Sequence, residues 1–308
     1  MKKFLKSIIR VIAFFFPKPI NIWLHRLAGG SIGKHVSIPP GVLLLVENLE
    51  IQDEAKIKFG TLMRVRTFKL GRKSSIGYFN LVNGADDFIV KSACVIGAKS
   101  IINCDRSVTF EYYSGNGPGC YIYTHGSFLP VTEGYRSTFA PIRIEEKVWI
   151  QMNCNIGPGV SIGKGSVIMP GTVLLESVEA NKMVVGDPAK LVKVPLFKQP
   201  IKNEKYNDFA HKILTEYCKW SNDYNKTDWK IEDNVLFFNE NRNTLSLSVD
   251  GESDIVILTE PGKIRNGMYF NLCDLTTDSS RVRLKLKLED FLRLHYGLIF
   301  LAPSKQAE

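Results

Sequence analysis

Aliphatic residues recur at every sixth position along much of this chain. The longest run consists of Ile144, Ile150, Ile156, Ile162, Ile168 and Leu174. Runs of three begin at residues 32, 51, 70 and 90, and successive runs are offset by 19, 19 and 20 residues. A helix repeats at about 3.6 residues and a flat strand at 2, so a step of six fits neither. Six residues do form one short strand and a turn, and three such units close a triangular coil.

Glycines and small residues accompany this step. A glycine directly follows the aliphatic residue at Gly77 and Gly97, where a corner leaves little room or needs unusual backbone angles. Small residues such as Ser74, Ser100 and Ser166 stand four positions after it. This suits stacked coils whose interior takes one large and one small side chain per strand. The pattern predicts a mainly β protein built as a parallel β-solenoid, because a β-sandwich would not hold a strict step of six.

The extent of the step predicts the domain organisation. We expect a basic, amphipathic helical segment over 1–30, the solenoid over 31–195, a linker and helix over 196–230, and a small β-rich domain over 231–308. Within the solenoid the step is interrupted between Ile102 and Ile144. The interruption predicts one partial coil that bears a loop insertion at 104–141. Long loops on a rigid scaffold commonly carry function.

The C-terminal part loses the period and has other signals. A helix is expected over 208–220. Turn signals at Asp250-Gly251 and Pro261-Gly262 separate β-prone runs. These runs are 235–238, 244–249, 255–259, 268–272 and 282–288. Acceptor recognition, glycan binding, assembly and simple packing on the solenoid all remain open as roles for this extension.

The first residues are basic and apolar. Seven lysines and arginines precede Glu47, the first acidic residue, and apolar positions from Phe4 to Phe16 form a broad helical face that Pro17 ends. The apolar run is too short to span a bilayer, and no small-residue cleavage site follows it. Two interpretations stay open: a helix on an anionic membrane surface, or a helix that caps the end of the domain.

Composition narrows the picture further. The 308 residues carry a net charge of +9 and are 44% hydrophobic, which is ordinary for a globular protein. Because much of the positive charge is local to the N-terminus, nucleic acid is not expected as a partner. The six cysteines include no CxxC pair, which argues against a zinc ribbon and indicates reduced thiols in a cytosolic protein.

Residues 142–193 carry a resemblance to a known family. The stretch runs IRIEEKVWIQMNCNIGPGVSIGKGSVIMPGTVLLESVEANKMVVGDPAKLVK, with the GDPAK ending at 186–190. It resembles the hexapeptide-repeat acyltransferases, in particular their galactoside, maltose and capsular-polysaccharide O-acetyltransferase branch. The resemblance implies a left-handed parallel β-helix, a homotrimer, acetyl-CoA as co-substrate and no metal.

The same resemblance implies that His125, in the interrupting loop, is the catalytic base. An imidazole suits this chemistry because its pKa lies near neutrality, so it can remove a hydroxyl proton and later protonate a thiolate. No covalent enzyme intermediate is needed. Glu133, Glu111 or a backbone carbonyl would each serve to orient the ring. Asn80 matches an asparagine near the thioester or acceptor, and a corner asparagine is the equally weighted alternative.

Donor binding is also an implication of the resemblance. Trp149, Met152 and Pro170 correspond to positions that line the cofactor groove between two prisms of a trimer, and Lys190 and Lys193 to basic positions for its phosphates. The chain departs from the family where Leu175 and Glu176 replace a common Thr-Lys pair, which removes one phosphate contact.

The resulting expectation is an acetyl-CoA-dependent O-acetyltransferase that acts on a sugar hydroxyl of a surface polysaccharide or its precursor. The carbohydrate acceptor would be reached in the cytoplasm, with peripheral contact at the inner face of the membrane left open. The alternatives are an N-acetyltransferase on a nucleotide-linked amino sugar and a non-catalytic hexapeptide-repeat scaffold. A γ-class carbonic anhydrase is disfavoured because only His125 lies well inside the repeats. A nucleotidyltransferase is excluded because no glycine-rich nucleotide domain precedes them.

Overall fold

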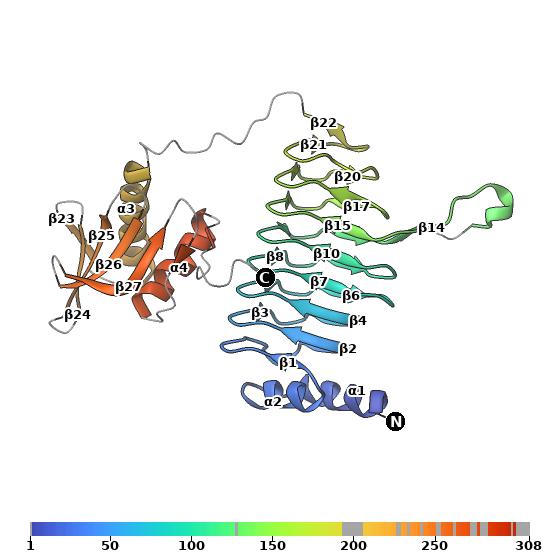
Figure 1. The fold of residues 1–308 in the computed structure, drawn as a ribbon, viewed down its shortest axis with the longest axis horizontal. Helices are drawn as coiled ribbons and strands as arrows, with labels where there is room; N and C mark the ends of the chain where they lie inside the picture. Colours follow the sequence, from blue (N-terminus) through green and yellow to red (C-terminus); the bar gives the residue numbers. More distant parts are fainter. Residues whose placement is uncertain are drawn as a thin grey trace. The chain divides into compact units, whose positions relative to one another are not determined.

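The computed structural model divides the chain into two compact units, Met1–Leu196 and Phe197–Glu308. The first unit is the parallel β-solenoid that the step of six predicts, with two helices at its start (Figure 1). The residues that the structure describes are 2–126, 129–192, 206–225, 229–232, 235–240, 243–250, 254–260, 263–271, 276–277, 283–296 and 298–299.

Each coil of the solenoid contributes one short strand to each of three faces. The first face holds β7 (Phe88–Val90), β10 (Val108–Phe110), β15 (Ile142–Ile144) and β18 (Ser161–Ile162). The second holds β3 (Lys56–Ile57), β5 (Ser75–Ile76), β8 (Val95–Ile96), β11 (Gly115–Asn116), β16 (Trp149–Ile150), β19 (Val167–Ile168), β21 (Met183–Val185) and β22 (Lys190–Leu191). The third holds β6 (Leu81–Asn83), β9 (Ile101–Asn103), β12 (Tyr121–Tyr123), β17 (Asn155–Ile156) and β20 (Val173–Leu174).

The first coils are less regular. β1 (Ser31–Ile32) pairs with β2 (Leu43–Ile51), and β2 pairs in parallel with β4 (Leu62–Leu70). The nine-residue β4 pairs with β6 through its first part and with β7 through its last part. One long strand therefore runs along the third and first faces, whereas the later coils turn between them.

The core of the solenoid consists of the inward residues of the repeat. Ile76, Ile96, Ile150 and Ile168 are almost completely buried on the second face. On the first face Phe68 stacks on Phe88 with ring centroids 5.7 Å apart, and Phe110 contacts Phe88 edge-on at 6.3 Å. Because equivalent residues of successive coils lie above one another, each coil covers the apolar surface of the next.

The small residues of the repeat satisfy the backbone at the corners. Ser74 is buried, donates its hydroxyl to the Lys91 carbonyl at 2.6 Å and accepts the Cys94 N–H at 2.9 Å. A Cβ on Gly77 would lie 2.6 Å from the Ala98 nitrogen of the next coil, and one on Gly97 would meet the Gly117 carbonyl carbon. Of the two reasons expected for these glycines, close approach of the coils is the one that holds.

The loop insertion is shorter than the expected 104–141. β10, β11 and β12 form a complete coil, paired in parallel with the coil before it. Its inward positions are Phe110, Asn116 and Ile122, twenty residues after Val90, Ile96 and Ile102. Asn116 hides the step in the sequence because it is a polar residue at an inward, buried position. Its Nδ2 is tolerated there because it donates to Ser100 Oγ at 3.0 Å and to the Gly117 carbonyl at 2.7 Å. The insertion therefore lies within residues 124–141.

Two helices cover the N-terminal end of the solenoid: α1 (Lys2–Ala13) and α2 (Ile20–Leu27). Asn21 Nδ2 donates to the Ile38 carbonyl at 2.6 Å, and the Gly41 N–H donates to the Phe14 carbonyl at 2.8 Å. Ala13 and Arg10 are buried. The structure thus places this segment as an end cap, as the second interpretation predicts, and contact with a membrane stays a prediction.

The described residues of the second unit form an antiparallel sheet and two helices. The sheet follows chain order: β23 (Trp229–Glu232), β24 (Val235–Glu240), β25 (Asn243–Asp250), β26 (Asp254–Glu260), β27 (Lys263–Asn271) and β28 (Thr276–Thr277). The helices are α3 (Tyr206–Asn225) and α4 (Arg283–Tyr296), which contact each other where Tyr217 meets Phe291 with centroids 5.2 Å apart.

The expected strand at 282–288 is wrong, because its described residues begin α4. Leucine and basic residues alternate there as in a strand, but the residues that follow restore a helical spacing. Leu288, Phe291 and Leu292 are buried on one face of the helix. The longer apolar pattern of the helix therefore outweighs the local alternation.

Candidate functional site

The corner between the third and first faces is where the loop insertion leaves the solenoid; we call it the loop corner. The chain continues from β12 into a two-stranded hairpin, β13 (His125–Gly126) and β14 (Thr138–Phe139), which are antiparallel. A short 3-10 helix, η1 (Val131–Glu133), lies farther out, and the loop projects well beyond the coils in Figure 1. His125 is the first residue of this hairpin, at the base of the loop.

The His125 ring is held by two side chains of the preceding coil. Its Nδ1 lies 2.9 Å from Asn103 Oδ1 and 3.1 Å from Asp105 Oδ2. The histidine side chain retains 31% of its accessible surface, so the ring is anchored on one edge and reachable on the other.

The hydrogen bonds around Asn103 determine which ring nitrogen carries the proton. Asn103 Oδ1 also accepts the Thr124 hydroxyl at 2.9 Å and the Asp105 N–H at 3.2 Å, which identifies this atom as the oxygen. Thr124 is buried and in turn accepts the Arg106 N–H at 3.0 Å. Since both partners of Nδ1 are acceptors, a neutral ring carries its proton on Nδ1. Nε2 is then the basic nitrogen.

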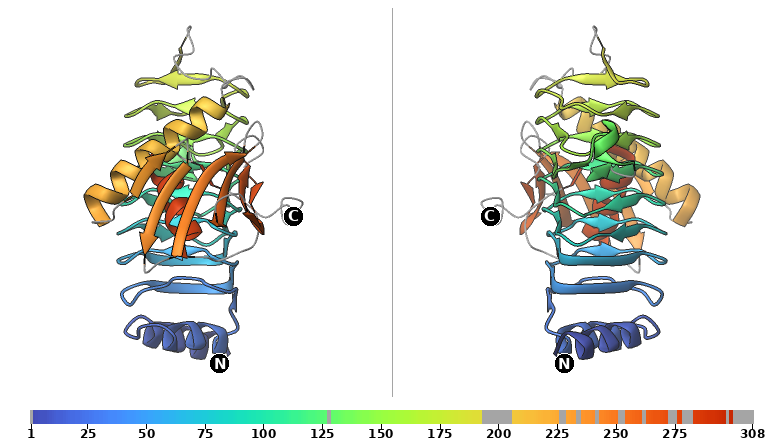
Figure 2. Two further views of the ribbon diagram at one scale, coloured as in Figure 1. Left: turned by 90° about the vertical axis from the view of Figure 1, so that its left-hand side faces the viewer. Right: turned by 90° about the vertical axis from the view of Figure 1, so that its right-hand side faces the viewer.

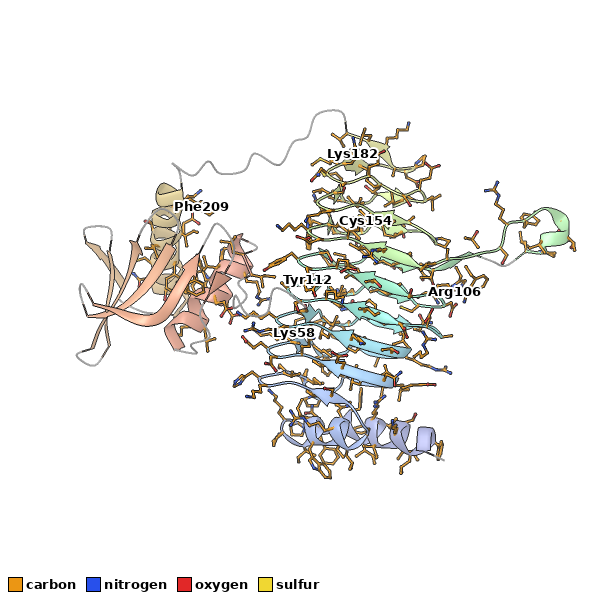
Figure 3. The ribbon with its side chains drawn as sticks, in the orientation of Figure 1. Lys58, Arg106, Tyr112, Cys154, Lys182 and Phe209 are labelled. Atoms are coloured by element: carbon orange, nitrogen blue, oxygen red, sulfur yellow. The ribbon has the colours of Figure 1, made fainter. Side chains whose placement is uncertain are left out.

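Aromatic rings complete the environment of His125. Phe139 stacks on it with centroids 5.5 Å apart and planes 15° apart, and Tyr123 meets it edge-on at 6.4 Å. Arg106 places its guanidinium carbon 5.5 Å from the centre of the Phe139 ring, and Figure 3 labels Arg106 at the base of the loop. The ring is therefore fixed in plane by stacking and in rotation by hydrogen bonds.

Neither carboxylate considered from sequence orients the ring. Glu111 pairs with Arg143 at 2.9 Å, and Glu133 is exposed in η1. The actual partners, Asn103 and Asp105, were missed. The signal was available in the register, because Tyr123 pairs with Asn103 and residues twenty apart therefore stack on successive coils.

Asp86 and Asp87 lie on the loop corner one coil earlier than Asp105. Both are engaged by Arg66: one Nη–Oδ distance to Asp86 is 2.6 Å, and the Nε–Oδ distance to Asp87 is 2.9 Å. The Arg66 hydrogen bond holds the pKa of Asp87 below its ordinary value. These carboxylates are thus committed to an ion pair in the structure.

The corner between the second and third faces differs; we call it the tight corner. Asn80 lies here and is 1% exposed. Its Nδ2 donates to the Gly77 carbonyl at 2.9 Å, and its Oδ1 accepts the Ser100 N–H at 2.8 Å. The expected substrate contact is therefore not supported, since the amide links two coils and is closed to solvent. Phe79, its neighbour, has the left-handed backbone (φ 55°) expected for a corner asparagine.

The expected donor-binding residues gather around the tight corner and the second face. Met152 is 50% exposed and Pro170 is exposed one coil later; the Gly171 N–H donates to the Met152 carbonyl at 3.0 Å. Trp149, 42% exposed, is on β16, and Lys190 is on β22 of the same sheet. Lys193 lies outside the described residues.

The structure does not bring these residues to His125 within one chain. His125 follows β12 at one end of the third face, whereas Met152 and Pro170 precede β17 and β20 at the other end. Trp149 lies one face farther away, on β16. Figure 2 shows the short strands of successive coils stacked above one another along the solenoid.

A family model describes part of this solenoid. Residues 141–176, from β15 to β20, match the bacterial transferase hexapeptide (six repeats). These coils are therefore similar to bacterial transferase hexapeptide repeats, and they form a parallel β-solenoid that is consistent with a left-handed β-helix.

Relatives of known name match parts of the chain. A putative acetyltransferase of Saccharomyces cerevisiae is 27% identical over 161 residues, 47% of this chain and 82% of the yeast protein. The 2,3,4,5-tetrahydropyridine-2,6-dicarboxylate N-acetyltransferase of Clostridium perfringens is 44% identical over 68 residues, 22% of this chain and 29% of the enzyme. Other relatives are matched over only 26% to 38% of their length.

Solved structures are also similar to this chain, and one of them is an acetyltransferase with its coenzyme bound. Galactoside acetyltransferase in complex with coenzyme A is 16% identical, with a TM-score of 0.31; the match covers 65% of this chain and 88% of that chain.

Proposed function

We propose that this protein is an acyltransferase that moves an acetyl group from acetyl-CoA to a sugar hydroxyl of a surface polysaccharide or its precursor. The observation that carries the proposal is the anchored His125, whose Nδ1 faces Asn103 and Asp105 and whose ring remains reachable from solvent. The hexapeptide repeats at 141–176 and the acetyltransferase relatives support the same class.

His125 is the general base of the proposed reaction. Nε2 removes the hydroxyl proton while the oxygen attacks the thioester carbonyl. The tetrahedral intermediate collapses, the carbon–sulfur bond breaks, and the imidazolium returns the proton to the leaving thiolate. The products are an acetyl ester and free coenzyme A. Asp105 stabilises the imidazolium, and Asn103 maintains the ring orientation throughout.

Donor binding requires a second copy of the chain in this proposal. Trp149, Met152, Pro170 and Lys190 line one side of a groove, and His125 lines the facing side from the neighbouring copy. Because these residues lie on different corners of one chain, a closed ring of copies unites them. We propose a homotrimer, in which three such grooves are equivalent by symmetry.

The test is thiol release from acetyl-CoA in the presence of a panel of sugars. His125→Ala should lower the rate at least about 100-fold, the usual scale for a general base, while folding and assembly are retained. Glu133→Gln, an exposed loop carboxylate, is the matched control and should match the parent. Equal rates for His125→Ala and the parent would remove His125 from its role.

An N-acetyltransferase on a nucleotide-linked amino sugar is the second candidate. The 44% identity to an N-acetyltransferase over 68 residues favours transfer to nitrogen, and the amino sugar is the acceptor expected from sequence. The same base accepts a proton from an amine. Amino sugars in the panel separate the two, because an ester product is cleaved by hydroxylamine and an amide product survives. A scaffold without activity would release no thiol with any acceptor.

A further inference from the structure

The outer side of the N-terminal cap is an apolar surface that nothing in the described chain covers. α1 and α2 lie across the end of the solenoid in both views (Figures 1 and 2). The side toward the coils buries Arg10 and Ala13 of α1 and Ile22 and Leu24 of α2. The larger apolar face points the other way.

We call that outward surface the cap face. Phe4 is 74% exposed, Phe15 70% and Trp23 60%, which are high values for aromatic side chains. The exposed apolar residues around them recur at helical spacing, three or four positions apart, so they share one side of the helices. The cap face consists of Phe4, Leu5, Ile8, Val11, Ile12, Phe15, Phe16, Ile20, Trp23 and Leu27, each at least 39% exposed. A contiguous apolar surface of this kind marks a binding site for a partner or a membrane.

Exposed cations accompany the cap face. Lys18, Arg26 and Lys34 are exposed, and with His35 they line a pocket of about 480 Å³ beside α2. Arg10 does not contribute to this surface, because it is 1% exposed. The chain has no carboxylate side chain before Glu47 in β2. The two helices and the turn between them therefore carry no acidic side chain, whereas Lys34 lies in the first coil, where its N–H donates to Asp53 Oδ1 at 2.7 Å.

We propose that the cap face binds the surface of an anionic lipid bilayer. Aromatic and aliphatic side chains enter the boundary between headgroups and acyl chains, while Lys18 and Lys34 contact the negative headgroups. Among the described residues no helix is long and apolar enough to cross a bilayer, so the contact lies in the interface plane. A second copy fits less well, because a two-fold contact would bring two cationic sets together. The proposal does not depend on the enzymatic function.

The test is flotation of the whole protein with vesicles of phosphatidylcholine alone or with a quarter phosphatidylglycerol. The parent should float with the anionic vesicles and much less with the neutral ones. Phe4→Ser with Trp23→Ser should lower partition at least about tenfold, and Lys18→Gln with Lys34→Gln by about tenfold. Leu175→Ser, which removes an apolar side chain 64% exposed on a solenoid coil, is the control and should bind as the parent.

Three outcomes would overturn the proposal. The parent fails to float with anionic vesicles; the Phe4→Ser, Trp23→Ser variant floats as well as the parent; or light scattering shows that this variant has lost the assembly that the parent forms, which would make the cap face a contact between copies. Because both side chains are exposed, the variant should keep the melting temperature of the parent. If it does not, Trp23→Ser alone provides the same comparison.

Discussion

The two corners at the ends of the third face are built from the same repeat and do opposite things. At the tight corner polar side chains turn inward: Asn80 is buried, and its amide connects Gly77 to Ser100 of the next coil. At the loop corner the polar side chains reach the surface: buried Asn103 and partly exposed Asp105 hold His125, whose side chain is 31% exposed. The comparison teaches that the partners of a polar corner residue decide its role. Where it bonds the backbone of two coils it stabilises the fold, and where it bonds a solvent-accessible side chain it can position that group for a reaction.

The test with the largest expected effect combines, in mixed trimers, one chain altered at the loop corner with another altered at the tight corner. His125→Ala and Met152→Glu should each be inactive alone. If each site takes His125 from one copy and Met152 from the next, random mixed trimers restore about a quarter of the parental sites. Co-expression followed by the thiol-release assay measures this recovery. Activity that stays at the level of the single variants would place both residues in a site within one chain.

A smaller effect is expected when Asp105 loses its charge. Asp105→Asn keeps the size of the side chain but no longer stabilises the imidazolium, so kcat should fall about tenfold with little change in KM. Steady-state kinetics on the best acceptor give both constants. A rise in KM with unchanged kcat would instead assign Asp105 to acceptor binding. Glu111→Gln, whose carboxylate pairs with Arg143, serves as the comparison.

The tight corner should respond in stability and not in activity. Asn80→Ala leaves the buried Ser100 N–H without its acceptor, which costs about 1–3 kcal/mol of the free energy of unfolding. Urea unfolding measures the loss, and kcat per folded molecule should stay unchanged. Asn48→Ala removes an exposed asparagine bonded to Thr67 and should have little effect. Lost activity with unchanged stability in Asn80→Ala would restore its assignment to substrate binding.

The smallest effect concerns acid stability at the loop corner. Arg66 holds the pKa of Asp87 below its ordinary value, so the ion pair stabilises the fold above the unfolded pKa of about 4 and is lost as pH falls below it. Asp87→Asn should therefore lose less stability between neutral and acidic pH than the parent does. The change is small, because the pair is solvent-exposed. Equal pH slopes of the urea midpoint would show that the pair contributes nothing.

Much of the solenoid could be predicted from the sequence because the same position of each six-residue repeat is buried in every coil. Each inward position, such as Ile96 or Ile150, is apolar for the same reason in every coil. The prediction failed at Asn116, where a polar side chain takes an inward position and its Nδ2 is hydrogen-bonded inside the core, and at 282–288, where a local alternation imitates a strand. The position of His125 in the interrupting loop was predicted, whereas its partners depended on the offset between coils.

By itself the sequence determined the step of six, the three strands of a coil and the amphipathic character of the first helix, since these follow from the spacing of side chains along one segment. Tertiary structure alone decided which residues of successive coils meet, and so paired His125 with Asn103 and Asp105. It also turned the broad apolar face of α1 away from the coils. The physical reason is the same in both cases: a spacing specifies which side chains share a face, but only the packed chain specifies what that face contacts.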